Sequence, residues 1–408
     1  MTQHLLEIDR RSFMKLGGAS LFGLLHGRFQ DTAAAVATGE KRVVVLELNG
    51  GNDGLNTLVP FGDDLYYQAR PKLAIKESSA LRLKNVVGFG LHPELRKLRE
   101  RYDQQQVAVI RGVGHPSPDL SHFAMQDYWR SGHPAGMAHT GQTGWLGRTL
   151  DRIANGSSEI AGLTVGWSLG PMMYAQTATT ASAGGAWSAH FNAPWQVQDV
   201  YLDAIAAMSA TFAGSSKSAS ASRKGLENGL ALDQFLRPFQ AKIPARLDYP
   251  DTHTGQLLGF AADILAVPSA IRALHVALPL DFDHHAAQLD RHARNLAELD
   301  AAVDVFLRDL EGIGIADTTL VMTTSEFGRR VTENAAGGTD HGTASCMFLI
   351  GPAVKGGFYG QQPPLDQLDA NGNLVATIAY TDVLATVAQN WLGATGVFSA
   401  PTLLDVFV

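Results

Sequence analysis

The chain has 408 residues and a formal net charge of −7, and it carries no long run of lysine or arginine. This composition disfavours nucleic acid as a partner, because such binding needs a broad basic surface. The single cysteine excludes a zinc site built from thiolates, whereas the 14 histidines are compatible with a site for a harder metal ligated by His, Asp and Glu.

The first predicted element is an export signal. Residues 9–15 (DRRSFMK) match the twin-arginine export pattern, and residues 33–37 (AAAVA) offer the small side chains that a signal peptidase accepts. The weakly apolar stretch between them, residues 16–25, is too short for a stable membrane anchor. We therefore expect residues 1–37 to be a signal peptide for the twin-arginine export machinery, and residues 38–408 to form a single periplasmic or secreted domain with no stable membrane span.

Six apolar segments in the rest of the chain predict strands. Several are apolar throughout, which is typical of strands buried on both faces of a parallel sheet. Helical patterns alternate with them, most clearly at residues 286–310, where apolar side chains recur every three or four positions. The alternation predicts an α/β fold with a doubly wound, mostly parallel sheet and helices on both of its faces. The predicted strands are residues 43–48, 107–110, 163–165, 273–280, 320–323 and 346–350, and the shorter predicted helices are residues 121–129, 257–265 and 381–391.

Two segments interrupt this alternation. Residues 177–189 and 209–222 are rich in Ala, Ser, Thr and Gly, a composition typical of surface loops. We therefore expect irregular loop insertions around residues 177–222, and the composition assigns them no chemistry.

Polar side chains follow four of the predicted strands, at the sheet edge where open α/β folds bind ligands. After the first strand, a glycine-rich turn carries Asp53, which is either part of a plain turn or an acid at the mouth of the sheet. After the second strand, Ser121 begins a predicted helix. A serine there is either an N-cap or a nucleophile that a metal activates and the helix N-terminus stabilises.

The other two segments hold most of the candidate acids and histidines. Residues 281–285 (DFDHH) place two carboxylates and two imidazoles directly after a strand. Such a cluster is either exposed to solvent or neutralised by a metal ion, and we favour the metal ion. Residues 317–345 contain a strand that is followed by Glu326 and Arg329 and then by His341. Arg329 is suited to clamp a tetrahedral oxyanion through paired hydrogen bonds, and its alternative role is an ion pair with Glu326.

Together these motifs resemble one family. The segments LNGGNDGLNTLVP, PSPDLSHFAMQDYW, FDHH, TTSEFGR and TDHGT, with the twin-arginine start, resemble the exported bacterial proteins known as domain of unknown function 1501, a family related to the alkaline phosphatase and sulfatase superfamily. The resemblance spans nearly the whole mature chain. It implies a doubly wound sheet with one or two divalent metal ions at its carboxyl edge. It also implies hydrolysis or transfer at phosphate or sulfate esters, on a small molecule or on a polymer.

The resemblance further implies roles for single residues. Asp53 matches a metal ligand that follows the first strand, and His341 matches a metal-binding histidine near the end of the chain. Ser121 is the better match to the nucleophile of the superfamily, and Ser117 is the second choice.

A second group of matches concerns the acid and histidine pairs. Asp283 and His285 match an acid and a histidine that bind one metal from a single loop, although the usual spacing fits Asp281 with His285 better. Where the superfamily commonly has an Asp-His pair, this chain has Glu326 and Phe327. Glu326 can replace the acid, but Phe327 cannot replace the imidazole, so the second metal site is weakened or holds a hard ion through oxygen ligands.

The sequence therefore predicts an exported metal-dependent hydrolase of phosphate or sulfate esters, and it leaves Zn, Mg, Mn and Ca open as the metal. Two alternatives are a non-catalytic exported binding or assembly protein on a degenerate hydrolase scaffold, and a mutase that moves phosphate within its substrate. The predicted catalytic residues are Ser121 and Arg329, and the predicted metal ligands are Asp53, Asp283, His285, Glu326 and His341.

Overall fold

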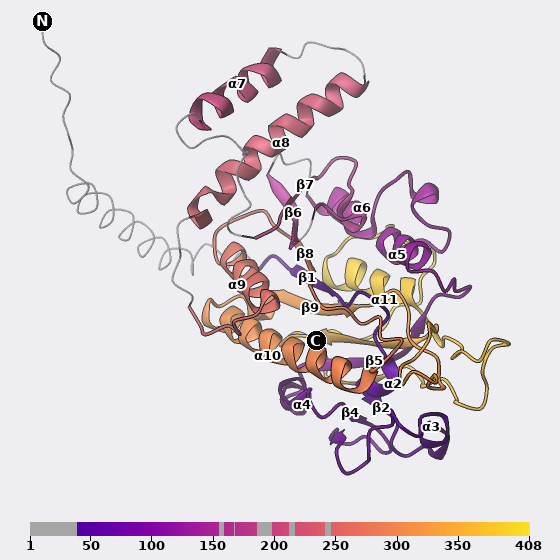
Figure 1. Ribbon diagram of the computed structural model, residues 1–408. Coiled ribbons are helices and arrows are strands. Elements are labelled where there is room, and N and C mark those ends of the chain that lie inside the picture. The colour runs from indigo at the N-terminus through magenta and orange to yellow at the C-terminus, as the bar shows by residue number, and fades with distance from the viewer. Residues whose placement is uncertain (1–38, 155–158, 167, 186–197, 212–216, 241–245) are drawn as a thin grey trace, which may run out of the picture.

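The computed structural model describes residues 39–154, 159–166, 168–185, 198–211, 217–240 and 246–408, and its centre is a nine-stranded sheet (Figure 1). Five neighbouring strands run parallel, in the order β9-β1-β8-β6-β7. On the other side of β9, β10 runs antiparallel to both β9 and β5, and β11 and β12 pair in parallel with β5. The strands are β1 (Arg42–Glu47), β5 (Val107–Gly114), β6 (Ile160–Val165), β7 (Thr179–Ala183), β8 (Ala273–Ala277), β9 (Thr319–Thr324), β10 (Ser345–Ile350), β11 (Gly357–Tyr359) and β12 (Ile378–Ala379).

Helices cover both faces of this sheet, which confirms the predicted fold class. Val44 and Leu46 of β1 belong to an apolar core with α4 (Arg96–Asp103), α9 (His253–Leu265) and α10 (Gln288–Gly312). The alternate residues Val43 and Val45 belong to the core on the opposite face, which the second set of helices covers (Figure 1). Those helices are α5 (His122–Ser131), α6 (Trp145–Ile153), α11 (Tyr380–Thr386) and the π-helical turn η4 (Val387–Trp391).

Short elements complete the described chain. A small three-stranded sheet has the order β2-β4-β3 and lies at the α3 end of the molecule (Figure 1). No helix among the described residues is long and apolar enough to cross a membrane. The short elements are α2 (Gly54–Thr57), β2 (Leu58–Val59), α3 (Asp64–Ala69), β3 (Leu81–Arg82), β4 (Gly90–Leu91), η1 (Met137–Thr140), η2 (Pro171–Met173) and η3 (Ala316–Thr318).

The described part of the region expected to form loop insertions contains regular elements, so the expectation was wrong there, and residues 186–197 and 212–216 lie outside the described residues. Strand β7 pairs with β6 along the sheet, and the helices α7 (Gln198–Thr211) and α8 (Lys217–Gln240) extend beyond β7 (Figure 1). The β7 sequence TTASA alternates buried and half-buried side chains, as in a strand, but its small residues give a weak apolar signal. The predicted signal peptide lies outside the described residues.

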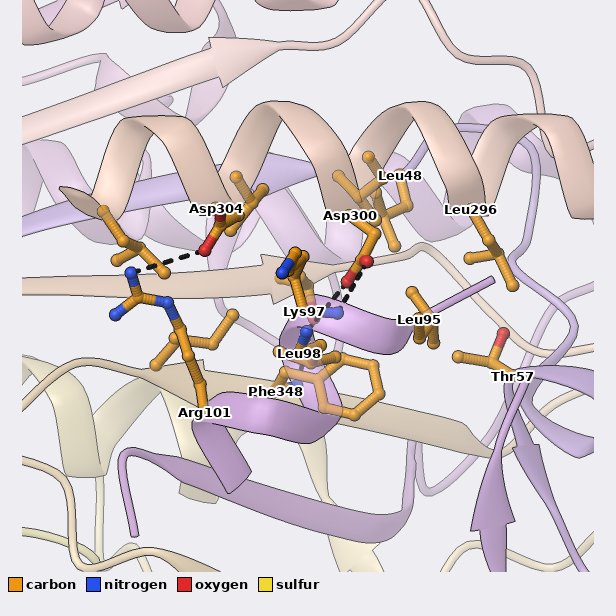
Figure 2. A pocket seen from close by; sticks show the side chains of 15 residues that line it. Leu48, Thr57, Leu95, Lys97, Leu98, Arg101, Leu296, Asp300, Asp304 and Phe348 are labelled. Atoms are coloured by element: carbon orange, nitrogen blue, oxygen red, sulfur yellow. Dashed lines mark hydrogen bonds and ion pairs between the residues drawn. The ribbon is translucent and has the colours of Figure 1, made fainter. Parts of the chain in front are cut away.

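A carboxylate of α10 caps the N-terminus of α4 and thereby joins the two helices (Figure 2). Leu95, at the N-cap position of α4, has no side chain that can accept a hydrogen bond. Asp300 of α10 takes this role, because its two oxygens accept from the backbone N–H groups of Lys97 and Leu98 at 2.8 Å each. Burial raises the pKa of Asp300 to about 6, although these two hydrogen bonds act in the opposite direction.

Candidate metal centre

Four side chains with metal-binding atoms meet at the carboxyl edge of the sheet. His122 comes from the first turn of α5, Asp283 and His285 come from the loop after β8, and His341 precedes β10. One ligand atom each of His122, Asp283 and His341 lies within 4.8 Å of the other two. The Nε2 atom of His285 lies 3.0 Å from Asp283 Oδ1 and 3.0 Å from His341 Nε2. We call these four residues the histidine–aspartate cluster.

The topology explains why these distant segments meet. Parallel strands β1, β8 and β9 all end at one edge of the sheet, and antiparallel β10 begins there, which brings in His341. Close backbone packing then joins the loops. The backbone N–H of Phe282 donates to Asn49 O at 2.8 Å, and a Cβ at Gly50, where φ is +103°, would overlap the backbone of Asp283. Glycine is therefore required at this approach of the β1 and β8 loops.

The three histidines of the cluster are each anchored through Nδ1. His122 Nδ1 donates to Glu326 Oε1 at 2.8 Å, and His285 Nδ1 lies 3.2 Å from the Asp340 carboxylate. His341 Nδ1 donates to the backbone carbonyl of Leu120 at 2.6 Å. Oxygen acceptors on Nδ1 are the usual partners of metal-ligating histidines, because they fix the ring and leave Nε2 free to bind the metal.

The Nε2 atoms that remain point at Asp283. They lie 3.0 Å (His285), 3.3 Å (His341) and 3.5 Å (His122) from the Asp283 carboxylate oxygens. His122 Nε2 is buried and has no hydrogen-bond partner. Donor atoms around a tetrahedral zinc ion are roughly 3.3 Å apart, given metal–nitrogen bonds of about 2.0–2.1 Å. Two or three imidazoles and one carboxylate at these separations fit one divalent ion, and this ligand set suits zinc or another transition metal better than calcium.

The charge states of Asp283 and His341 also suit metal binding, whereas that of His122 opposes it. Burial raises the pKa of Asp283, but the ion pair with Arg329 at 2.5 Å and the nearby histidines outweigh it and lower the pKa to about 2. Burial is the main reason that the pKa of His341 is lowered. The hydrogen bond to Glu326 raises the pKa of His122. At neutral pH Asp283 is therefore ionised and His341 is neutral, which are the forms that bind metals.

Glu326 was predicted as a metal ligand, and the structure places it behind the cluster. Its side chain is 1% exposed. Besides His122, its Oε1 atom accepts from the backbone N–H of Gly50 at 2.9 Å and lies 3.3 Å from Gln126 Nε2. Glu326 therefore orients His122 and holds the β1 loop in place.

Arg329 was predicted to clamp an oxyanion, and the structure instead shows its guanidinium engaged within the protein. It is 2% exposed. Its Nε donates to Gly51 O at 2.8 Å, Nη1 donates to Thr339 O at 2.9 Å, and Nη2 contacts Gly50 O and Asp283. The alternative ion pair with Glu326 is replaced by the pair with Asp283. Arg329 therefore supports the loops and the acid of the cluster from behind.

Asp53 was also predicted as a metal ligand, but the structure does not bring it into the cluster. Its Oδ2 pairs with the buried Arg70 at 2.6 Å and accepts from Gln288 Nε2, and its Oδ1 caps α2 by accepting from Leu55 N at 3.2 Å. Burial raises the pKa of Asp53, and the Arg70 charge and hydrogen bond more than offset this, so the pKa is lowered. Both carboxylate oxygens are committed to structural partners.

The remaining predicted residues lie around the cluster. Ser121 is the N-cap residue of α5, as the sequence predicted, yet its side chain makes no capping hydrogen bond and the residue is exposed. Ser117 is exposed in the preceding loop. Of the two acids after β8, Asp283 joins the cluster, whereas Asp281 pairs with Arg291 at 3.2 Å.

Phe327 occupies space beside the cluster. It is 1% exposed, and its ring centroid lies 4.8 Å from that of His122 and 4.7 Å from that of His341. An aromatic hydrocarbon offers no ligand atom, so this position contributes to the packing of the two histidines and not to a second metal site.

His122 is the cluster residue that the sequence reasoning missed. The signal that could have found it is helical spacing, because His122, Gln126 and Arg130 are four residues apart on α5 and therefore share one face. All three point toward the carboxyl edge: His122 and Gln126 contact Glu326, and Arg130 contacts Glu47 at the end of β1.

The fold and the cluster together define an α/β protein with a candidate metal centre at the carboxyl edge of a mostly parallel sheet. The sequence model of one family, described as protein of unknown function (DUF1501), matches residues 261–392. This match confirms the family resemblance over that segment, which holds the FDHH, TTSEFGR and TDHGT motifs. No curated protein matches the chain.

Several solved structures resemble the chain at low sequence identity. A phosphonate monoester hydrolase of Agrobacterium radiobacter is 10% identical, with a TM-score of 0.38 and coverage of 86% of this chain and 74% of that one. A 2-O GAG sulfatase is 11% identical (TM-score 0.40, coverage 90% and 73%). A protein in the alkaline phosphatase superfamily from Vibrio parahaemolyticus is 8% identical (TM-score 0.35, coverage 88% and 68%). At TM-scores this low, the likeness says nothing about the activity of this chain.

Proposed function

We propose that this chain is an exported metal-dependent hydrolase of phosphate or sulfate esters, with one divalent ion held by His122, Asp283 and His341. The observation that supports the metal site is the orientation of the histidines, whose Nδ1 atoms are anchored on oxygen acceptors while their Nε2 atoms converge on one ionised carboxylate. The ester class comes from the family resemblance. Three protein ligands leave a coordination position open, as in catalytic zinc sites.

Each remaining group has a role that follows from its surroundings. When bound, a divalent ion in such a site polarises the oxygens of an ester and lowers the pKa of a bound water or hydroxyl. Ser121 is the proposed nucleophile, because its exposed hydroxyl is not used for capping and its chain neighbours Leu120 and His122 contact the site. His285 is 46% exposed and backed by Asp340, so we assign it the transfer of a proton to the leaving group.

The experiment combines metal analysis with turnover. Purified protein is loaded with zinc or manganese, dialysed, analysed for metal, and assayed with p-nitrophenyl phosphate and p-nitrophenyl sulfate. We expect about one ion per chain and metal-stimulated hydrolysis of at least one ester in the wild type, and neither in His122→Ala. His139→Ala, at an exposed histidine outside the cluster, is the matched control. A wild type that binds no metal, or whose turnover is unaffected by metal, would contradict the proposal.

Two further variants separate the roles of the other groups. Ser121→Ala should retain the metal and lose turnover if its hydroxyl is the nucleophile. His285→Ala should also retain the metal while hydrolysis slows. Loss of the metal in His285→Ala would instead make His285 a ligand, as the sequence predicted.

A second candidate function is a non-catalytic binding or assembly protein on the same scaffold. The observations that favour it are the side chains of Phe327 and Arg329, which give neither a second metal site nor a free guanidinium for the substrate. This candidate predicts stoichiometric metal binding without turnover of any phosphate or sulfate ester. A mutase would convert a phosphorylated substrate without releasing inorganic phosphate, so product analysis separates it from a hydrolase.

The domain organisation and the export route are also proposals. We infer that residues 1–37 are removed on twin-arginine export and that residues 38–408 act as one domain. N-terminal sequencing of protein recovered from the periplasm of an expressing bacterium tests the cleavage. Replacement of Arg10 and Arg11 by lysine should abolish its appearance there.

A further inference from the structure

A cavity of about 530 Å³ lies beside the histidine–aspartate cluster, between α5 and the loops that follow β1, β6 and β8. Its volume is within the range of about 300–1,000 Å³ that is typical of small-molecule sites. None of the four cluster residues lines it. The two sites share a wall, because Gln126 lines the cavity and its Nε2 lies 3.3 Å from Glu326 Oε1, the oxygen that holds His122.

The floor of the cavity is a polar group of three residues from three elements, of which Glu47 and His275 are buried and Arg130 is half-buried. Glu47 ends β1, His275 lies in β8, and Arg130 comes from α5. Arg130 binds both Glu47 oxygens, at 2.9 and 3.2 Å, and His275 Nε2 lies 3.0 Å from Glu47 Oε2. Glu47 is 5% exposed and His275 is 3% exposed. Buried ion pairs add little stability compared with apolar packing, so this group calls for a role other than holding the fold together.

His275 has a second ring nitrogen that no group among the described residues satisfies. Its Nδ1 is buried without a hydrogen-bond partner. Gly170, which also lines the cavity, lies opposite it, and a Cβ there would come within 3.3 Å of His275 Nδ1. An unsatisfied buried nitrogen costs about 1–3 kcal/mol. Because residue 170 has no side chain, space remains between this nitrogen and the cavity that Gly170 lines.

The chemistry of the lining identifies the kind of ligand. The charges of Arg130 and Glu47 cancel within their own ion pair, so an ionic ligand has no counterion on the floor of the cavity. The neighbouring groups both donate and accept hydrogen bonds, as hydroxyl groups require. Flat apolar and aromatic surfaces lie beside them. The groups that both donate and accept are Asn49, Gln126, Ser168, His253 and His275, and the flat surfaces come from Pro171, Tyr174 and Pro279.

We propose that this cavity binds a neutral sugar ring, which is the alcohol part of the ester that reacts at the cluster. The inference rests on the proposed function and names its substrate class. Helix α5 links the two sites, since Arg130 at the cavity floor and His122 at the cluster flank Gln126 at successive four-residue steps. Each step is about 6 Å along the helix, so one sugar ester spans from the cavity to the cluster.

The test measures binding of neutral saccharides by ligand-observed NMR. The probes are glucose, galactose, N-acetylglucosamine and their methyl glycosides, added to the full mature chain. We expect saturable binding of at least one probe, weakened about tenfold or more in Gly170→Ala, whose new methyl group faces His275. The φ of −73° at Gly170 is compatible with alanine. The matched control is Gly225→Ala, at an exposed position in α8 where an added Cβ would meet no atom of another element within 4 Å.

A second variant keeps the test independent of folding. Tyr174 is 40% exposed at the cavity, so Tyr174→Ala should weaken saccharide binding while the thermal unfolding midpoint stays near that of the wild type. Absence of binding for every neutral probe, or equal binding by the wild type and both cavity variants, would overturn the proposal. The same titration on His122→Ala, without metal, should still show binding. Saccharide binding by a wild type that takes up no metal and turns over no ester would instead sink the proposed hydrolase while leaving the sugar site intact.

Discussion

The buried ion pair of Asp53 and Arg70 tests whether Asp53, at the carboxyl edge of the sheet, stabilises the fold or binds the metal. Their side chains are 3% and 0% exposed and 2.6 Å apart. Asp53→Asn leaves the Arg70 guanidinium in the protein interior without its counterion. Breaking a buried pair in this way costs about 3–5 kcal/mol. For a chain of this length, that corresponds to a fall of roughly 4–6 °C in the unfolding midpoint.

The assay follows thermal unfolding by circular dichroism and the metal content of the folded protein in parallel. We expect Asp53→Asn to lower the midpoint and to leave the metal per folded chain unchanged, because Asp53 is not part of the cluster. The exposed acid Asp405, whose ion pair with Lys355 lies at the surface, provides the control variant Asp405→Asn, which should barely change the midpoint. Loss of metal from Asp53→Asn with an unchanged midpoint would refute this reasoning and make Asp53 a ligand.

The pH dependence of the same comparison has a definite sign. Because the pKa of Asp53 is lowered in the folded protein, its contribution to stability is present above the unfolded value of about 3.9 and is lost as the pH falls below it. The difference in midpoint between wild type and Asp53→Asn should therefore shrink as the pH is lowered through about 4.

Three further predictions concern the loops around the cluster and the junction of α4 with α10. Gly51→Ala should lower the free energy of unfolding in urea by roughly 2–4 kcal/mol, because φ is +74° there and a Cβ would overlap the Phe327 ring; an unchanged urea midpoint would contradict this. Since the pKa of Asp300 is raised to about 6, the folded state binds that proton more tightly than the unfolded state. The stability of the wild type relative to Asp300→Asn should therefore fall as the pH rises from about 4 to 6, and a constant difference would count against the buried carboxyl. Glu326→Gln should weaken metal affinity by about 10–100-fold in a chelator competition without abolishing binding, whereas complete loss would make Glu326 a direct ligand.

The sequence predicted the fold well where strands are rich in large apolar residues. Residues 43–48 and 320–323 correspond to β1 and β9, which lie side by side in the middle of the sheet. The sequence did not predict β7, whose small residues give no strong apolar signal, or α7 and α8, which are rich in Ala and Ser. Such helices and edge strands are recognised through the elements they pack against, and a linear pattern does not contain that information.

The sequence could predict only those site residues that lie in the loops at the ends of strands. Asp283, His285 and His341 come together because the loops that carry them meet at one sheet edge. Asp53 is not a ligand because it pairs with the buried Arg70, which lies 17 residues further along the chain. No local pattern reveals such a partner. His122 directly follows the N-cap residue Ser121, and only its four-residue spacing to Gln126 and Arg130 on α5 distinguishes it as a site residue.

The proposed function depends above all on one divalent metal ion bound by His122, Asp283 and His341. The most direct measurement is an anomalous difference map from crystals of the mature protein grown with zinc, with data collected on both sides of the zinc absorption edge. We expect one peak per chain, about 2.0–2.2 Å from the Nε2 atoms of both histidines and from the Asp283 carboxylate. An empty cluster, or a peak ligated by Asp53 instead, would contradict it.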